Sequence, residues 1–338
     1  MISIFYFFLI FFVFSMLMVG LFLMIVRKKI SFHDIPNERS SHSSSTPRGG
    51  GIVFVILWAT IVFVTFFNLN ISLNVFFAFL FSILVGITGF LDDRFHLCIS
   101  TRFIMYLFSA IMAAIFLKGI PELHLGIITL KLGWMGYPLS VLGLIWSINL
   151  FNFMDGIDGI ATLEALTVFI FGGWFFYHSG GYEFAKLSWI LCCILFGFFV
   201  WNFPPAKLFM GDVGSAFLGF LVILFSIIGE NLFNISAVLW MMLYGIFCFD
   251  STVTLIRRMI HNEKWYLPHR MHAYQRLQLC GWSHRKILFW MSVLNLCICL
   301  LTLIAFYKRI LILPLTGVEI ILLVVIYIII EKMQPMYH

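Results

Sequence analysis

The sequence predicts an all-α polytopic integral membrane protein with about eleven transmembrane helices, or ten on a stricter count, its N-terminus outside and its C-terminus in the cytoplasm. Of the 338 residues, 62% are hydrophobic and only 11% are charged, and the mean hydropathy is +1.05. A soluble domain carries about 25% charged residues. Apolar runs of membrane-spanning length recur along the chain, with polar segments between them.

A run of about 20 apolar residues crosses a bilayer. On that measure the expected spans are Ile4–Val26, Gly51–Phe67, Val75–Leu91, Phe103–Leu117, Tyr137–Phe151, Ile160–Tyr177, Ala185–Trp201, Ser215–Gly229, Ile235–Ile256, Ile287–Phe306 and Leu311–Ile330. No separate soluble domain or internal repeat is visible, so residues 1–338 are expected to form a single membrane-embedded domain.

Positive charges set the expected orientation of the spans. The first span has no basic residue before it and Arg27-Lys28-Lys29 directly after it, which indicates a retained helix whose N-terminus is outside. Sixteen of the 21 Lys and Arg residues then lie on the cytoplasmic side. The cytoplasmic loops are expected at about 27–50, 92–102, 152–159, 202–214 and 257–286. The net charge of +6 therefore reflects membrane topology and says little about nucleic acid.

Aspartate residues are confined to one side of this topology. All seven fall in the cytoplasmic loops or near the cytoplasmic ends of spans, at positions 34, 92, 93, 155, 158, 212 and 250. Four glutamates, at positions 122, 183, 230 and 319, map to the outer side. Because solvation of loops would scatter both acids alike, we expect the Asp residues to form one cytoplasm-facing site.

Two candidate segments flank the second and third spans. Arg48 precedes Gly49-Gly50-Gly51 at the head of the second span, where free backbone N–H groups and a guanidinium suit a phosphate; a flexible linker is the alternative. Asp92 and Asp93 end the third span. Adjacent carboxylates repel each other unless a cation or a proton lies between them, so the pair indicates a metal, a basic group or a base; an acidic helix end is the alternative.

The segment 149–159 holds Asn152, Asp155 and Asp158, with Gly156 and Gly159, between two apolar runs. Polar side chains so close to lipid are costly, which makes them functional candidates. Their oxygens could hold a metal ion, phosphates or a nucleobase, and a plain polar turn is the alternative.

Asn202 ends the seventh span, just before two prolines that end a helix. Asp212 then lies between two Gly at the head of the eighth span. It is a candidate ligand, with simple helix capping as the alternative. Phe209, three residues earlier, could stack on a base or lie against lipid.

The loop 257–286 contains two histidines in a short predicted helix. Pro268 suits a first helical position and Gly281 a stop. On such a helix His269, His272 and Arg276 would share one face and could cradle phosphate. Zinc is not expected, because the loop offers no Cys or further His at ligand spacing.

Together these motifs resemble the polyprenyl-phosphate N-acetylhexosamine-1-phosphate transferase family, also called glycosyltransferase family 4. The matching residues are Asp92-Asp93, Asn152-x-x-Asp155-Gly156-x-Asp158-Gly159, Phe209-Met210-Gly211-Asp212-x-Gly214-Ser215 and a late stretch with His. That stretch, His269-Arg270-Met271-His272, departs from the run of His common in the family. With Arg39-Ser40-Ser41-His42 and Thr46-Pro47-Arg48-Gly49-Gly50-Gly51, it is most similar to the O-antigen-initiating branch.

The resemblance implies a Mg-dependent phosphoglycosyl transferase of the bacterial inner membrane, whose active site faces the cytoplasm. Such an enzyme transfers an N-acetylamino-sugar 1-phosphate from a UDP-sugar to polyprenyl (undecaprenyl) phosphate, releasing UMP and forming a polyprenyl-diphospho-sugar. This is the first membrane step of O-antigen or related glycan synthesis. The alternative is a transporter or flippase of lipid-linked sugar, which would place ionisable residues near the bilayer midplane and on both faces.

The resemblance also implies roles for the candidate residues. Asp92, Asp93, Asp212 and His269 are the expected catalytic residues; Asn152, Asp155, Asp158, Asn202, Phe209, Arg270, His272 and Arg48 are expected to bind substrate; Asp212 and Asp155 are the expected ligands of Mg²⁺, or of Mn²⁺ in its place. The expected partners are a UDP-N-acetylamino sugar, polyprenyl phosphate and the lipid bilayer. No nucleic acid is expected, and a homodimer is left open.

Overall fold

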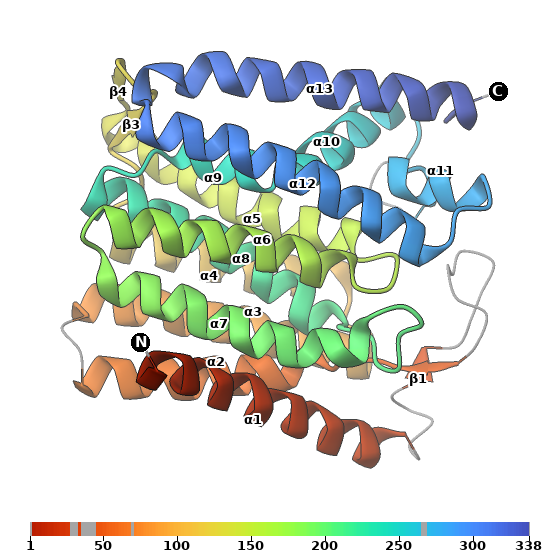
Figure 1. Ribbon diagram of the computed structural model, residues 1–338, viewed down its shortest axis with the longest axis horizontal. Helices are drawn as coiled ribbons and strands as arrows, with labels where there is room; N and C mark the ends of the chain where they lie inside the picture. The colour runs from red at the N-terminus through yellow and green to blue at the C-terminus, as the bar shows by residue number, and fades with distance from the viewer. Residues whose placement is uncertain (1, 28–32, 35–44, 69–70, 265–268, 338) are drawn as a thin grey trace.

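The computed structural model describes residues 2–27, 33–34, 45–68, 71–264 and 269–337 as a bundle of long helices lying side by side (Figure 1). Within these residues, ten helices are long and apolar enough to cross a membrane, or eleven if one bent pair counts as a span. The predicted all-α membrane fold and its count of spans are therefore confirmed. Most of the predicted loop 27–50 and Pro268, the predicted helix start, lie outside the described residues.

The ten long helices are α1 (Ile2–Val26), α2 (Gly51–Asn68), α3 (Leu73–Phe95), α4 (Ile99–Leu117), α5 (Gly136–Met154), α6 (Ile160–His178), α7 (Tyr182–Asn202), α8 (Asp212–Phe233), α12 (His284–Tyr307) and α13 (Ile312–Met333). The shorter elements are α9 (Ala237–Leu243), α10 (Gly245–Ile260), α11 (Ala273–Leu279), the 3-10 turns Gly133–Met135 and Arg309–Leu311, and the strands β1 (His33–Asp34), β2 (Thr46–Pro47), β3 (Glu122–His124) and β4 (Thr129–Lys131). The strands form two antiparallel pairs, β1 with β2 and β3 with β4.

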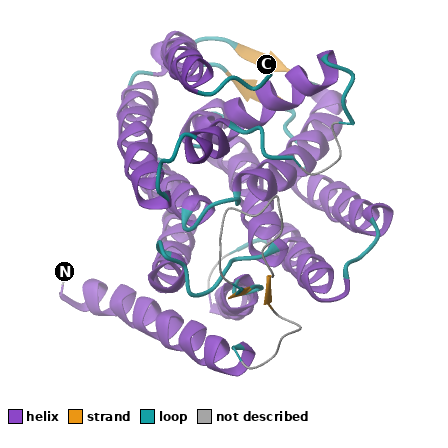
Figure 2. Cartoon of the chain, turned by 90° about the vertical axis from the view of Figure 1, so that its right-hand side faces the viewer, coloured by secondary structure: helices purple, strands orange, loops and turns teal. Residues whose placement is uncertain are grey.

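Helix α8 is the centre of the bundle. It is buried along nearly its whole length and packs against α2, α3, α5 and α6. Helix α1 packs on α7 and α13 on α12, at opposite edges of the bundle (Figure 1). Both edge helices expose large apolar side chains, such as Met24 and Ile321, as helices that face lipid do. Figure 2 shows the bundle from one end, with several helices seen end-on.

Close backbone contacts fix the start of α8. A Cβ at Gly51 would lie 2.6 Å from the Cα of Gly214, and a Cβ at Gly89 would lie 2.5 Å from the carbonyl oxygen of Asp212. Small residues let membrane helices approach this closely. Helices α2 and α3 therefore hold the first turn of α8 between them.

The predicted ninth span, Ile235–Ile256, is not one helix. It is divided into α9 and α10, which meet at an angle of 80° at Tyr244. The carboxylate of Glu319 on α13 reaches into this break, since a Cβ at Gly245 would lie 1.8 Å from its Oε1. The predicted span is therefore present as a bent pair of helices, and its apolar sequence, which has no proline, did not reveal the bend.

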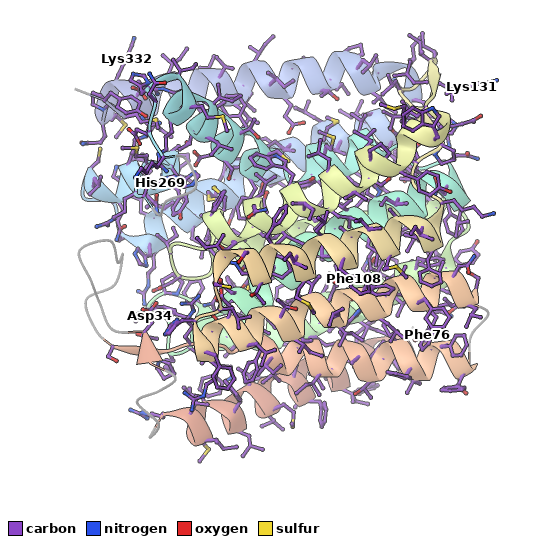
Figure 3. The ribbon with its side chains drawn as sticks, turned by 180° about the vertical axis from the view of Figure 1, so that it is seen from behind. Asp34, Phe76, Phe108, Lys131, His269 and Lys332 are labelled. Atoms are coloured by element: carbon purple, nitrogen blue, oxygen red, sulfur yellow. The ribbon has the colours of Figure 1, made fainter. Side chains whose placement is uncertain are left out.

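From α1 to α8, and again from α12 to α13, consecutive helices run in opposite directions, so the chain turns at two ends of the bundle (Figure 1). One end collects the last residues of α3, α5 and α7 and the first residues of α4, α6 and α8. We call it the aspartate end, because Asp92, Asp155 and Asp212 lie there. Figure 3 shows Asp34, His269 and Lys332 at this end, and Phe76 and Lys131 at the opposite end.

Candidate active site

Asp93 and the start of α8 form the base of the site. Gly211 adopts a φ of +79° and turns the chain into α8, whose first residue is Asp212. The backbone N–H groups of Asp212 and Val213 donate to the two carboxylate oxygens of Asp93, at 3.0 and 3.1 Å. A carboxylate at a helix N-terminus satisfies free N–H groups and complements the helix dipole. Asp93, on α3, thereby fixes where Asp212 lies.

Two backbone hydrogen bonds hold the segment around Arg48 against the chain that precedes α8. The N–H of Phe209 donates to the carbonyl of Pro47 at 2.8 Å, and the N–H of Gly50 donates to the carbonyl of Phe209 at 2.9 Å. Nη2 of Arg48 then lies 2.9 Å from Oδ1 of Asp93 and donates to Oδ1 of Asp212. Burial opposes the positive charge of Arg48, but Asp212 and Asp93 raise the pKa of its guanidinium above the ordinary value.

Arg102 supplies a second guanidinium, from the first turn of α4. Its Nη1 donates to Oδ2 of Asp92 at 2.5 Å and to Oδ2 of Asp212 at 3.2 Å. Asp212 is therefore bridged to Asp93 through Arg48 and to Asp92 through Arg102. Three carboxylates and two arginines, drawn from four separate segments, meet at one point of the aspartate end.

Asn152 and Asp155 border this cluster at the end of α5. Nδ2 of Asn152 donates to Oγ of Ser215 on α8 at 3.3 Å. Burial raises the pKa of the Asp155 carboxyl well above its ordinary value; Arg48 opposes this rise, and the charges of Asp212 and Asp93 add to it. A cation that binds beside such a buried carboxyl group favours its charged carboxylate form.

The side chains of Asp158 and Asn202 form hydrogen bonds with other residues of the protein. Oδ2 of Asp158 accepts the N–H of Ala206 at 3.0 Å and lies 3.2 Å from Nδ1 of His284. The amide of Asn202 accepts from Thr162 at 3.0 Å and donates to the carbonyl of Leu208 at 3.0 Å. Both side chains therefore shape the loop that precedes α8. Their direct contact with substrate stays a prediction, as does that of the half-buried Phe209.

The helix predicted around His269 begins later than expected. Helix α11 starts at Ala273, so His269 precedes it and does not share a helix face with His272 and Arg276. Arg276 instead points away from the histidines, because its Nη1 lies 2.5 Å from Oε2 of Glu331 on α13. The predicted His269, His272 and Arg276 cradle was therefore wrong in its geometry.

The two histidines still lie together, beside the segment 152–158. Their rings are 4.8 Å apart, and the ring of His272 lies 6.2 Å from that of Phe153. Burial, His272 and Arg258 lower the pKa of His269 to about 3. His269 is therefore a neutral imidazole at physiological pH and can exchange hydrogen bonds there without carrying a charge. Arg270 donates from Nη2 to Oε1 of Gln278 at 3.3 Å.

The donor chemistry of the cluster fits a hard divalent cation. In the part of the chain that the structure describes, no group of three or more His, Cys, Asp or Glu side chains is placed to hold a metal. Arginines neutralise Asp92, Asp93 and Asp212 instead. Asp155, however, is a carboxyl whose surroundings favour an added cation, and the oxygens of Asp155, Asp212 and Asn152 are the ligand type that Mg²⁺ prefers.

Three residues of the site are not among those that the sequence motifs predict. Arg102 is one of them, although a guanidinium one turn inside an apolar helix, near two Asp residues, is a signal of function. His284 and Tyr274 carry no such signal, because only the tertiary fold brings them to Asp158 and to the carbonyl of Phe153.

Known proteins are similar to this chain over most of its length. A family model described as glycosyl transferase family 4 matches residues 75–230, which run from the start of α3 to the end of α8. The chain is 31% identical over 287 residues, covering 81% of this chain and 78% of the relative, to a probable undecaprenyl-phosphate N-acetylglucosaminyl 1-phosphate transferase of Bacillus subtilis.

Two further relatives are more distant. The chain is 29% identical over 281 residues to an undecaprenyl-phosphate alpha-N-acetylglucosaminyl 1-phosphate transferase of Yersinia pestis, covering 78% of this chain and 75% of the relative. It is 28% identical over 316 residues to a phospho-N-acetylmuramoyl-pentapeptide-transferase of Clostridium botulinum, covering 87% of this chain and 94% of the relative.

Proposed function

Because the chain belongs to glycosyl transferase family 4, and thus to the sugar-1-phosphate transferases that use polyprenyl phosphate, we propose that it transfers an N-acetylamino-sugar 1-phosphate from a UDP-sugar to undecaprenyl phosphate. The product would be undecaprenyl-diphospho-sugar, and UMP would leave. We place the reaction at the cytoplasmic face of a bacterial inner membrane, as the first membrane step of O-antigen or a related cell-envelope glycan. The named substrates of the two glucosaminyl relatives make N-acetylglucosamine the first sugar to test.

One observation carries the proposal: carboxylates and guanidinium groups from separate helices converge at one end of a membrane bundle. Two anionic reactants must meet in this reaction, so fixed positive groups are needed against their repulsion and against charge that develops in the transition state. Arg48 and Arg102 can supply that charge. Asp212 holds both arginines in place until the phosphates arrive.

In the proposed reaction an oxygen of the lipid phosphate attacks the β-phosphorus of the UDP-sugar. A new P–O bond forms to the lipid, and the bond to the α-phosphate of UMP breaks. Both oxygens of Asp93 already accept backbone N–H groups, so Asp92 is the better candidate to remove a proton from the lipid phosphate. In the alternative mechanism, one carboxylate of the Asp92 and Asp93 pair is a covalent nucleophile.

Asp212 and Asp155 would hold the divalent cation, with Mg²⁺ or Mn²⁺ as the candidates. Bound there, the cation would offset charge on the diphosphate. Asn152 would contribute its amide beside the first turn of α8, where its Nδ2 donates to Oγ of Ser215.

An apolar cavity beside the site supports a polyprenyl acceptor. The cavity measures about 410 Å³, lies between α10, α11, α12 and α13, and is lined by side chains such as Trp290 and Tyr327. Met154, which belongs to the segment 152–158, and Tyr274, which donates to the carbonyl of Phe153 in that segment, form part of its wall. A long isoprenoid chain could lie there with its phosphate directed toward the aspartates.

The test is an assay of the purified protein with Mg²⁺, undecaprenyl phosphate and a panel of UDP-sugars, in which released UMP and the lipid product are measured. We expect UMP from one UDP-N-acetylamino sugar, in an amount that depends on the lipid phosphate. A transporter of lipid-linked sugar would release none. Absence of UMP with every sugar, or release that does not require the lipid, would refute the proposal.

A further inference from the structure

Asp250 is a buried carboxylate that no step above uses. It lies on α10 and is only 4% exposed. Its Oδ1 accepts the backbone N–H of Ala273 at 2.9 Å and the hydroxyl of Thr254 at 3.1 Å. The same oxygen lies 3.5 Å from Nδ1 of His272, an ion-pairing distance rather than a hydrogen bond. Burying a charge is costly unless it is engaged in this way.

These contacts place Asp250 at the start of α11. A helix of seven residues is too short to be stable by itself, so its position depends on what binds its ends. The carboxylate of Asp250 satisfies the first free N–H of α11, and the N–H of His272 donates to Oε1 of Gln275 at 3.3 Å. The imidazole of His272 is therefore fixed between Asp250 and the rings of His269 and Tyr274.

Helix α11 in turn supports the segment 152–158. The hydroxyl of Tyr274 donates to the carbonyl of Phe153 at 3.0 Å. A Cβ at Gly156 would lie 2.0 Å from that hydroxyl, so this segment and α11 are in close contact. Movement of α11 would therefore shift both His272 and the residues around Asp155.

We propose that Asp250 is a positioning residue for the phosphate-transfer reaction: its carboxylate holds the start of α11 and orients the His272 imidazole toward the segment that carries Asn152 and Asp155. The 80° bend at Tyr244, where Glu319 contacts Gly245, sets the direction of α10 that brings Asp250 to α11. The inference rests on the proposed function for its effect on rate. The placement of α11 can be tested without that function.

Three variants separate the contacts of Asp250. Asp250→Asn keeps an oxygen that can accept from Ala273 and Thr254 and removes only the charge that faces His272. Asp250→Ala removes every contact. Thr254→Val is the matched control, since it removes one hydrogen bond to the same oxygen and leaves Ala273 and His272 untouched.

We would measure UMP release at varied UDP-sugar concentration, and amide hydrogen exchange in peptides that cover residues 269–279. Asp250→Ala should lower kcat about 100-fold, because a small misplacement of a binding group costs this much, and should speed exchange in α11. Asp250→Asn should lower kcat with little change in KM and with unchanged exchange, since the charge that orients the His272 imidazole is lost while the contact with the start of α11 remains. Thr254→Val should match the wild type in both measurements.

A wild-type kcat in Asp250→Asn, or unchanged exchange in Asp250→Ala, would overturn the inference. If the wild-type protein released no UMP, the proposed function would fail. The exchange of α11 in Asp250→Ala would then still decide whether Asp250 positions this helix.

Discussion

Asp212 shares its charge with two arginines, one from the segment before α2 and one from α4. Each arginine also contacts a second carboxylate, Asp93 for Arg48 and Asp92 for Arg102. Such bridges keep three acidic groups within a small volume despite their mutual repulsion. In the proposed reaction the same two guanidinium groups would face the phosphates of the substrates.

Removal of the charge of Arg102 tests this arrangement. We expect Arg102→Gln to lower kcat about 10²-fold, as loss of one charge-stabilising group typically does. The measurement is UMP release by purified protein. Lys207→Gln is the control, because Lys207 is an exposed base of the same end whose Nζ lies over the ring of Trp201. Equal kcat in Arg102→Gln and in Lys207→Gln would contradict the role of Arg102.

We expect His269 to make the folded protein sensitive to acid. Its pKa is lowered from 6.5 to about 3, by burial first and then by His272 and Arg258, so between these values the unfolded chain binds a proton that the folded protein does not. Stability should therefore fall as the pH is lowered from about 6.5 toward about 4. We expect the melting temperature of His269→Gln to fall less over this range than that of the wild type. Parallel curves for the two proteins would show that His269 is not held neutral.

The start of helix α8 depends on the backbone φ angle of Gly211. Its φ of +79° directs the chain into α8, and a Cβ there would lie 2.3 Å from Oδ2 of Asp93. Gly211→Ala should displace the Asp93 carboxylate and lower kcat about 10²-fold. The matched control is Gly281→Ala, which has a φ of +84° with no atom near the added methyl, and which should cost about 1–2 kcal/mol of stability without loss of kcat. Comparable activity in both variants would mean that the clash with Asp93 is unimportant.

The elements that the sequence predicts well are those defined by apolar length. The start of α8 near Asp212 and the end of α3 near Asp92 follow from apolar runs that stop at Gly or Asp. The break at Tyr244 was not predicted, because the apolar run 235–256 contains no proline and Glu319, which lies against the break, is more than 70 residues later in the chain. The start of α11 is contacted by Asp250 of another helix. Sequence patterns report local preference and do not show which distant side chains lie against an element.

The candidate residues share one end of the helix bundle. The motifs predicted that Asp92, Asp155 and Asp212 would meet, and the fold brings them together. Which side chains pair could not be predicted, since it depends on how α3, α4 and α8 pack. The orientation in the membrane stays a prediction from the positive charges, with the aspartate end in the cytoplasm.

Cys98 offers a test of that orientation. It is exposed at the aspartate end, and hydrogen bonds with Ser100 and Thr101 lower the pKa of its thiol to about 7, which favours rapid reaction of the thiolate. A membrane-impermeant maleimide should label Cys98 in inverted membrane vesicles and not in intact cells. Cys98→Ser identifies this signal among the other cysteines. Labelling of Cys98 in intact cells would reverse the predicted orientation.

We propose that the acidic cluster around Asp212 is the active centre of a phosphoglycosyl transferase. Its role is tested by the rate of UMP release from a UDP-N-acetylamino sugar, with Mg²⁺ and undecaprenyl phosphate at saturation, by wild type, Asp212→Asn and Glu122→Gln. Glu122 is an exposed carboxylate at the opposite end and serves as the control. We predict that Asp212→Asn lowers kcat about 10²–10³-fold while Glu122→Gln keeps the wild-type rate. Near-normal turnover by folded Asp212→Asn would show that the cluster around Asp212 is not the active centre.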